Sequence, residues 1–266
     1  MANRGVAEGS AVYLYGVSLA TKGGDTEGSA AKGGKKGQRG EVTSTGVDGV
    51  HAVEAVSCGE FLCWVSPVDQ IAFSQELEKN MENLEWLAVH GVRHQQVVGE
   101  IAQVETIVPA RFGTLFSSQA ALLKDVEARK SALKNVFNRI ADSDEWGVKV
   151  LVEDQPAKPV ATAAAHSGRE YLQQKAARIR TKPERDDAEL EQLASALGKV
   201  ATESAPAGRV SGAQPGLLWQ ATFLVARSRR KQWERVLHDF VQQWQGKRRI
   251  EVTGPWPPYS FVSDAR

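Results

Sequence analysis

The strongest indication of the fold is that the pattern of apolar residues changes from strand-like to helix-like twice along the chain. In the first half, Ala11–Leu19, Val50–Ser57 and Phe61–Ser66 are rich in β-branched and aromatic residues, which is typical of β-strands. The last two segments flank Gly59 and predict a hairpin. From residue 68 to residue 140, apolar residues recur at steps of three and four, which predicts helices. Pro109 interrupts this region, and Ser117 or Ser118 is suited to cap the helix that follows.

The second half repeats the change of period. Glu145–Glu153 alternates apolar and polar residues as a strand does, and Leu217–Ala226 forms a second apolar strand pattern. A long helical region between them is interrupted near Pro183. Gln232–Gln245 then places apolar residues on one face of a helix, before a short closing strand at Arg249–Thr253.

This grouping predicts an α+β fold in which antiparallel sheets are covered by helices. At roughly 150 residues per domain, the 266 residues suit two domains. We place the boundary at Ser143, where the last helix of the first half ends, so that the domains are residues 1–143 and 144–266. The second domain is expected to be a ferredoxin-like split βαβ unit with a proline-aromatic tail at 254–266.

Composition excludes several classes of protein. The 33 Lys and Arg residues nearly cancel the 32 Asp and Glu residues, so a general nucleic-acid-binding role is not expected. A hydrophobic content of 42% excludes disorder of the whole chain. No stretch approaches the about 20 apolar residues of a membrane-spanning helix, and neither a leader nor a disulfide framework is evident. We therefore expect a soluble cytoplasmic protein without a membrane partner.

Residues 21–40 form a segment rich in glycine and lysine. It contains seven glycines and no large apolar side chain, so it cannot bury enough surface to offset its ordering entropy. The glycines do not have the spacing of a phosphate-binding loop. We expect a flexible solvated insertion, with anion binding by its basic residues as the less favoured reading.

No arrangement of residues predicts catalysis or metal binding. His90 and His94 are spaced to face one way on a helix, but the residues between them lack the glutamate of a zinc-protease motif, and no third ligand is evident. Hydrogen-bonded imidazoles at a half-buried helix edge are the favoured interpretation. Cys58 and Cys63 have no second pair of ligands and are expected to pack as small apolar residues. We therefore expect no cofactor, no metal and no enzymatic activity.

Arg111 is the one isolated polar residue of interest, because it lies beside Phe112 and Gly113 between two helical regions. A planar guanidinium can donate two parallel hydrogen bonds to a carboxylate and so hold a turn. We predict a structural clamp over Pro109–Thr114, with ligand binding as the alternative.

The C-terminal tail is unusual, because residues 253–261 contain three prolines and three aromatic residues. Pro255, Pro257 and Pro258 remove backbone donors and exclude a central strand. Trp256, Tyr259 and Phe261 each have roughly 150–250 Å² to bury, so they must pack on this chain or on a partner. We predict that residues 255–261 fold back on the second domain, with Trp256 and Tyr259 as anchors; docking onto a partner is the alternative.

Five segments together resemble the GvpL/GvpF family of gas vesicle proteins. They occur in the order of the family and span nearly the whole chain: Tyr13-Leu-Tyr-Gly16, Val108-Pro-Ala-Arg-Phe-Gly-Thr114, Glu145-Trp-Gly-Val-Lys-Val150, Gly168-Arg-Glu-Tyr-Leu172 and Thr253-Gly-Pro-Trp-Pro-Pro-Tyr-Ser-Phe261. The residues of these motifs that we single out as architectural are Arg111, Phe112, Gly113, Trp146, Gly168 and Tyr171. The segment at 21–40 departs from the compact pattern of the family.

The resemblance implies a non-enzymatic accessory or minor structural protein of gas vesicles, the gas-filled shells that provide buoyancy. It implies two α+β domains, the second ferredoxin-like, and a location on the vesicle shell within the cytoplasm. It also implies contact with the shell protein GvpA and with other gas vesicle proteins during assembly. The alternative function is a small-anion-binding protein or an enzyme that uses Arg111 and the basic glycine-rich segment.

Overall fold

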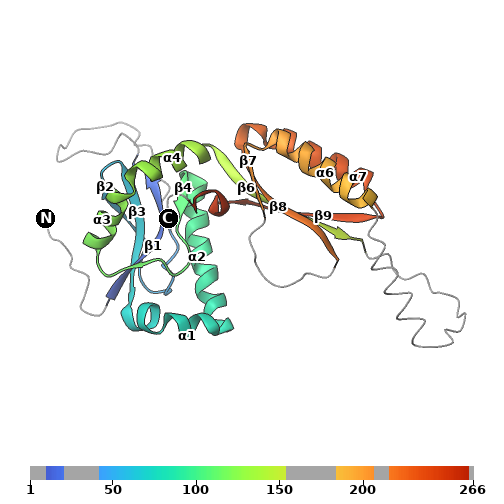
Figure 1. Ribbon diagram of the computed structural model, residues 1–266. Helices are drawn as coiled ribbons and strands as arrows, with labels where there is room; N and C mark the ends of the chain where they lie inside the picture. Colours follow the sequence, from blue (N-terminus) through green and yellow to red (C-terminus); the bar gives the residue numbers. More distant parts are fainter. Residues whose placement is uncertain (1–9, 21–41, 154–183, 207–215, 264–266) are drawn as a thin grey trace, which may run out of the picture. The chain divides into compact units, whose positions relative to one another are not determined.

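A computed structural model describes residues 10–20, 42–153, 184–206 and 216–263 (Figure 1). The chain divides into two compact units. The first comprises residues 1–142 together with 256–266, and the second comprises residues 143–255. The chain therefore leaves the first unit at Asp142 and returns to it at Trp256. The segment at 21–40 and the motif residues Gly168 and Tyr171 lie outside the described residues.

The first unit is built on an antiparallel sheet with the strand order β2-β3-β1-β4, in which β5 also pairs with β1. Its strands are β1 (Ser10–Leu19), β2 (Glu54–Cys58), β3 (Phe61–Asp69), β4 (Ile107–Pro109) and β5 (Leu115–Phe116). Strands β2 and β3 form the expected hairpin, which turns at Gly59 with a φ of 60°. The short strands β4 and β5 were not predicted, because the segment between two helices has too few residues to show a period.

The helices of the first unit follow the predicted pattern only in part. They are η1 (a π-helix, Ile71–Gln75), α1 (Leu77–Glu82), α2 (Leu84–Val104), α3 (Gln119–Ala128) and α4 (Lys130–Ile140). Ser118 caps α3 as predicted, since its hydroxyl accepts the N–H of Ala121. A single helix was expected across α3 and α4, but it is broken at Arg129. The apolar spacing continues in register across that break, so the sequence carries no signal of it.

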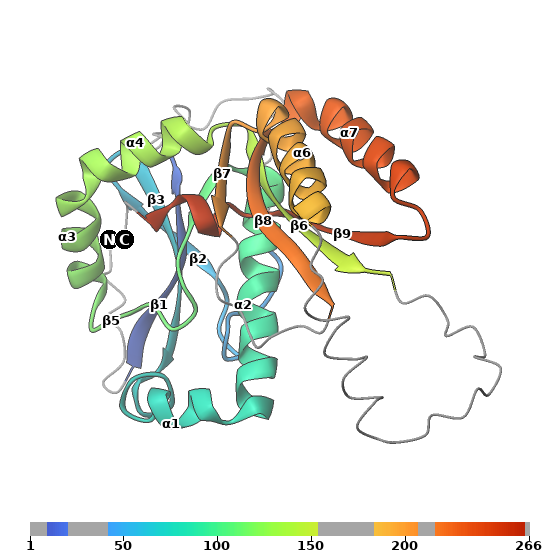
Figure 2. The same ribbon diagram turned by 45° about the vertical axis from the view of Figure 1, so that its right-hand side comes forward.

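Strand β1 is buried on both faces, because helices cover each side of the sheet. Tyr13 and Tyr15 belong to the core that includes Val97, Val98 and Ile101 of α2. Leu14 and Val17 instead line a pocket together with Leu133 of α4. Since successive side chains of a strand point to opposite faces, α2 and α4 lie on opposite sides of this sheet (Figure 2).

The second unit is a four-stranded sheet with the order β7-β8-β6-β9. Its elements in chain order are β6 (Ser143–Val152), α6 (Glu184–Val200), β7 (Glu203–Pro206), β8 (Leu217–Ala226), η2 (Arg227–Arg229), α7 (Arg230–Gln243) and β9 (Arg248–Trp256). Strand β8 pairs antiparallel with both β6 and β7. Strand β8 has the predicted bounds, whereas β7 was not predicted, and β9 is longer than the closing strand we expected.

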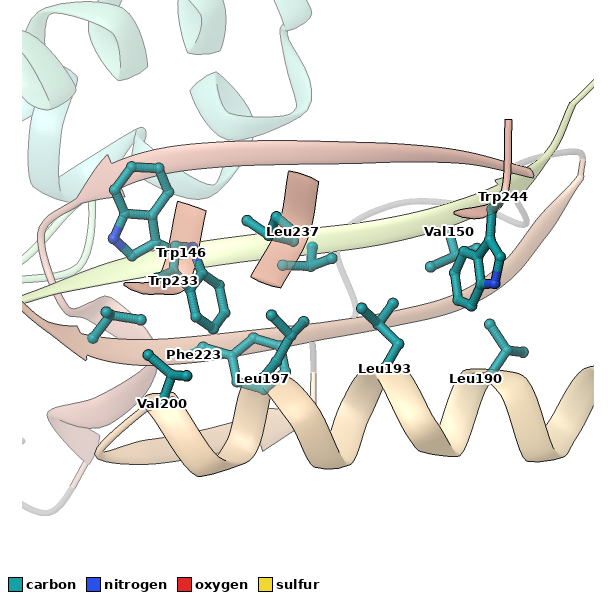
Figure 3. Close-up of a cluster of buried hydrophobic side chains, with 13 residues drawn as sticks. Trp146, Val150, Leu190, Leu193, Leu197, Val200, Phe223, Trp233, Leu237 and Trp244 are labelled. Atoms are coloured by element: carbon teal, nitrogen blue, oxygen red, sulfur yellow. The ribbon is translucent and has the colours of Figure 1, made fainter. Parts of the chain in front are cut away.

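Both helices of the second unit contribute to one apolar core against the sheet (Figure 3). In α6, Leu190, Leu193 and Leu197 point toward the strands at steps of three and four residues, as an amphipathic helix does. Trp233 and Leu237 come from α7, in the same core. The coarse expectation is thus confirmed: two antiparallel sheets are covered by helices. No helix among the described residues is long and apolar enough to cross a bilayer.

The tail corrects one sequence-based expectation. We predicted that residues 255–261 fold back on the second domain, but residues 256–266 belong to the first unit. A short helix there, η3 (Tyr259–Phe261), is followed by Val262, and Phe261 and Val262 are both buried. Trp256, expected to be an anchor, is 50% exposed. The tail therefore packs on the first unit, through Tyr259, which is one of the two expected anchors, and through Phe261 and Val262.

Candidate functional site

The Pro109–Thr114 segment joins β4 to β5 beside the central strand of the first unit. Backbone hydrogen bonds hold it there: the N–H of Ala110 donates to the carbonyl of Tyr15, and the N–H of Leu14 donates to the carbonyl of Thr114, each at 2.9 Å. Gly113 has a φ of 80°, which disfavours any residue with a Cβ. The segment is thereby fixed against β1 by its backbone, and this explains the need for glycine in the motif.

A buried imidazole links this segment to the first unit's core. Nδ1 of His94, on α2, lies 2.9 Å from the hydroxyl oxygen of Tyr13. That hydroxyl also accepts the N–H of Gly113 at 3.0 Å. On the other side of the ring, Nε2 of His94 lies 3.3 Å from the hydroxyl of Tyr259 in the tail. Three motif segments, which contain Tyr13, Gly113 and Tyr259, therefore meet at one histidine.

One placement of the protons gives every N–H and O–H group in these contacts a hydrogen-bond acceptor. Because Tyr13 already accepts the Gly113 N–H, its own hydroxyl proton is free to be donated to Nδ1 of His94. The neutral imidazole then carries its proton on Nε2 and donates it to Tyr259. The hydroxyl of Tyr259 donates to Oε1 of Gln95 at 3.5 Å. The site is thus a closed polar network with the histidine neutral.

Burial fixes the charge states of this network. His94 is 1% exposed, and burial lowers its pKa to about 4, although the backbone of Ala110 acts in the opposite direction. Burial likewise raises the pKa of Tyr13 above its ordinary value, and this effect outweighs the hydrogen bond from Gly113, which lowers the pKa. Both groups are therefore neutral at neutral pH, which is the state that their hydrogen bonds require.

Aromatic rings surround the network. Tyr13 and His94 lie edge-to-face, and Phe112 makes edge contacts with both. Near them, the ring of His90 stacks on Trp86 with centroids 4.1 Å apart, and Nδ1 of His90 donates to the Trp86 carbonyl at 2.7 Å. Phe112, predicted to be architectural, is half-buried in this cluster.

The guanidinium of Arg111 does not act as the predicted clamp. The residue is exposed, and its side chain makes no hydrogen bond or ion pair with any residue that the structure describes. Its carbonyl instead accepts the N–H and the hydroxyl of Thr114, at 3.1 and 2.7 Å. The turn is therefore held by the backbone, which sequence reasoning could not distinguish from a side-chain clamp.

The tail crosses from one side of the first unit's sheet to the other. Tyr259 contacts His94 on α2, and the carbonyl of Phe261 accepts a hydrogen bond from Arg139 on α4. Pro257 and Pro258 are buried, whereas Pro255 and Trp256 are exposed. The tail therefore joins the two helical layers of the unit.

Two further motif segments meet in the second unit. Trp146 is buried in its core. A Cβ on Gly254 would lie 2.8 Å from the carbonyl oxygen of Glu145 and 3.1 Å from the Trp146 ring. A Cβ on Gly147 would similarly lie 2.7 Å from the Thr253 hydroxyl. Strands β6 and β9 thus approach closely where each motif has a glycine.

The remaining sequence candidates stay separate from this network. Cys58 and Cys63 are buried and free, and burial raises the pKa of Cys63 to about 12. Among the described residues, no group of three or more His, Cys, Asp or Glu side chains is placed to hold a metal ion. His94 and His90 were predicted to be hydrogen-bonded imidazoles at a half-buried helix edge. His94 is hydrogen-bonded but almost fully buried, and local spacing does not show which of the two imidazoles is buried.

Comparison with known proteins identifies the relatives of this fold. The family model described as gas vesicle synthesis protein GvpL/GvpF matches residues 11–263. Gas vesicle protein L of Streptomyces sp. strain CB03234 is 29% identical over 201 residues, which cover 71% of this chain and 74% of that protein. Gas vesicle protein F1 of Halobacterium salinarum is 25% identical over 225 residues, covering 84% and 86%.

Solved structures agree at the level of the fold. The crystal structure of GvpF from Anabaena sp. PCC7120 has a TM-score of 0.67 at 16% identity, with 96% of each chain covered. GvpF from Microcystis aeruginosa has a TM-score of 0.61 at 16% identity, with 95% of this chain and 99% of that chain covered. At this identity the likeness concerns the fold alone.

Proposed function

Because the chain belongs to the GvpL/GvpF family of gas vesicle synthesis proteins, we propose that it is a non-enzymatic accessory or minor structural protein that binds the shell protein GvpA during vesicle assembly. The observation that carries the proposal is the family match over residues 11–263, which includes residues of both units. Membership makes this a gas vesicle-related protein. Binding of GvpA and of other gas vesicle proteins, and a shell-associated location in the cytoplasm, are parts of the proposal.

The use of the motif residues supports an architectural role. Tyr13, Gly113 and Tyr259 hydrogen-bond to one another or to a buried histidine. Gly147 and Gly254 allow two strands to approach closely. These contacts are all made within one unit or the other, and they fix the fold rather than present reactive groups to a substrate.

We also propose that the second unit is ferredoxin-like. Its described elements follow the order strand, helix, strand, strand, helix, strand, and the sheet order β7-β8-β6-β9 places the first and third strands at the centre. This is the arrangement expected of a split βαβ unit. Strand β9, which contains Pro255, lies at the edge of the sheet, where a missing backbone donor is tolerated.

The first unit offers an apolar surface suited to an apolar partner. On α2, Leu84 is 79% exposed and Val92 is 56% exposed. These side chains are eight residues apart, so they lie within one broad stripe of the helix. A shell subunit with a gas-facing apolar surface is prone to aggregate before assembly. A helix stripe that covers this apolar surface would keep the subunit unaggregated until it enters the shell. We therefore propose that GvpA binds to this stripe of α2.

Co-purification with tagged GvpA tests the proposal. We expect the full chain to be retained, and we expect the double variant Leu84→Glu, Val92→Glu to lose most of that retention with unchanged melting. Gln119→Glu, an exposed change on α3 and so away from the α2 stripe, is the matched control and should bind normally. Failure of the full chain to bind GvpA would contradict the proposal. Immunodetection on flotation-purified vesicles then distinguishes a shell component from an assembly factor.

A further inference from the structure

The first unit has a pocket of about 400 Å³ on the side of its sheet that faces α3 and α4. Its walls are largely apolar and include Leu14 and Val17 of β1, Val108 and Pro109 of β4, and Leu133 of α4. The volume is in the range of pockets that bind small molecules or single large side chains. The pocket is separate from the His94 network, which lies on the α2 side of the same sheet.

The pocket is lined by more positively charged than negatively charged side chains. Asp125 and Arg129 line it and form an ion pair with each other, four residues apart on the chain. Arg111 also lines it, is exposed, and has no ion-pair partner among the residues that the structure describes. The lining therefore carries one guanidinium that no local carboxylate neutralises.

We propose that this pocket binds an internal segment of a partner protein in which a large apolar side chain lies beside an Asp or Glu carboxylate. The apolar walls would hold the side chain, and the carboxylate would accept paired hydrogen bonds from Arg111. Recognition through side chains suits this edge of the sheet, because β4 has only three residues and ends in a proline, which leaves little backbone for strand addition.

This inference goes beyond the proposed function and does not depend on it, because the pocket and the GvpA-binding stripe of α2 are different surfaces. Variants of the pocket and variants of the α2 stripe should therefore fail in different assays. Loss of peptide binding at the pocket with intact GvpA binding would affect this inference alone.

The test uses a random dodecapeptide library displayed on phage and selected on the full chain. We expect enriched sequences to contain Asp or Glu next to Leu, Ile, Phe or Met. The enriched peptide, synthesised with blocked ends, should bind Arg111→Gln about tenfold more weakly, which corresponds to one lost charged contact. Ala110→Leu, which narrows the pocket, should weaken it similarly. Lys79→Gln removes an exposed charge elsewhere on this unit and is the matched control.

Binding should also weaken as salt is raised, since the contact is ionic and partly exposed. Circular dichroism confirms that each variant is folded. Enriched peptides without a carboxylate, or equal binding by wild type and Arg111→Gln, would overturn the proposal. Arg111-dependent binding of inorganic phosphate without any selected peptide would also overturn it, because the pocket would then be a small-anion site.

Discussion

The hydroxyl oxygen of Tyr13 lies 2.9 Å from Nδ1 of His94, although the two residues are 81 positions apart. Tyr259 reaches the other ring nitrogen of the same histidine from 165 positions away. A strand, a helix and the C-terminal tail are therefore tied by one buried imidazole. Because a buried polar group without a partner is costly, the three elements depend on one another.

Removing the hydroxyl of Tyr259 should weaken the first unit. We expect Tyr259→Phe to lower the free energy of unfolding by about 1 kcal/mol, because the buried ring of His94 loses one of its two side-chain hydrogen-bond partners. Chemical denaturation measures the change. Trp256→Phe, at a half-exposed position of the same tail, is the control and should change stability little. Equal effects of the two substitutions would show that the hydroxyl is not part of the network.

The network also predicts a dependence of stability on pH. The unfolded chain protonates His94 below its ordinary pKa of about 6.5, whereas in the folded protein its pKa is about 4. Between these pH values the unfolded state binds more protons than the folded state. The contribution of the neutral His94 to the free energy of unfolding, which is fully present above pH 6.5, is therefore lost as the pH falls toward 4. The loss should be about 3 kcal/mol.

Denaturation curves at several pH values, compared with those of His94→Gln, isolate this contribution. Carboxylates such as Asp48 and Glu100, whose pKa values are lowered, titrate in both proteins and cancel in the difference. The variant should therefore show a shallower slope between pH 4 and 6.5. Parallel slopes would mean that His94 binds protons equally in the folded and unfolded states, so that burial does not lower its pKa.

Local patterns were sufficient for a strand that is marked by a nearly continuous run of apolar residues. Leu217–Ala226 was predicted with its observed bounds, since a run of apolar residues between turn signals is typical of a buried strand. The break at Arg129 was missed, because the apolar positions on both sides keep one helical register. The position of the tail was also predicted wrongly. Its aromatic residues show that it must pack, but not on which surface.

The site illustrates the same limit. The position of Gly113 between two helical regions predicted an extended or turning link there, and its φ of 80° is local geometry that a motif can encode. Whether Arg111 points to a carboxylate or to solvent depends on residues far away in sequence. The choice between His90 and His94 as the buried imidazole depends on which helix face meets Tyr13. Such tertiary pairings have no signal in a single sequence.

Substitutions in the Pro109–Thr114 segment should separate backbone from side-chain control. Arg111→Lys should change the free energy of unfolding by less than about 0.5 kcal/mol, because the guanidinium is exposed. This reverses the expectation from sequence. Gly113→Ala should lower it by about 1–2 kcal/mol, the cost of a left-handed conformation with a Cβ. Thermal melting of the two single variants measures both, and a larger effect for Arg111→Lys would restore the clamp.

Truncation of the tail should destabilise the first unit and spare the second. A chain that ends at Pro255 lacks Tyr259, Phe261 and Val262, which pack on the first unit. Loss of several buried side chains should cost a few kcal/mol, with about 25 cal/mol per Å² of apolar surface exposed. Hydrogen exchange should therefore show reduced protection in α2 and α4, which Tyr259 and Phe261 contact, and unchanged protection in α6 and α7.

Phe261→Ala should give a weaker form of the same pattern, whereas Leu237→Ala, in the core of the second unit, should reduce protection in α6 and α7. Loss of protection confined to α6 and α7 after truncation would instead mean that the tail packs on the second unit.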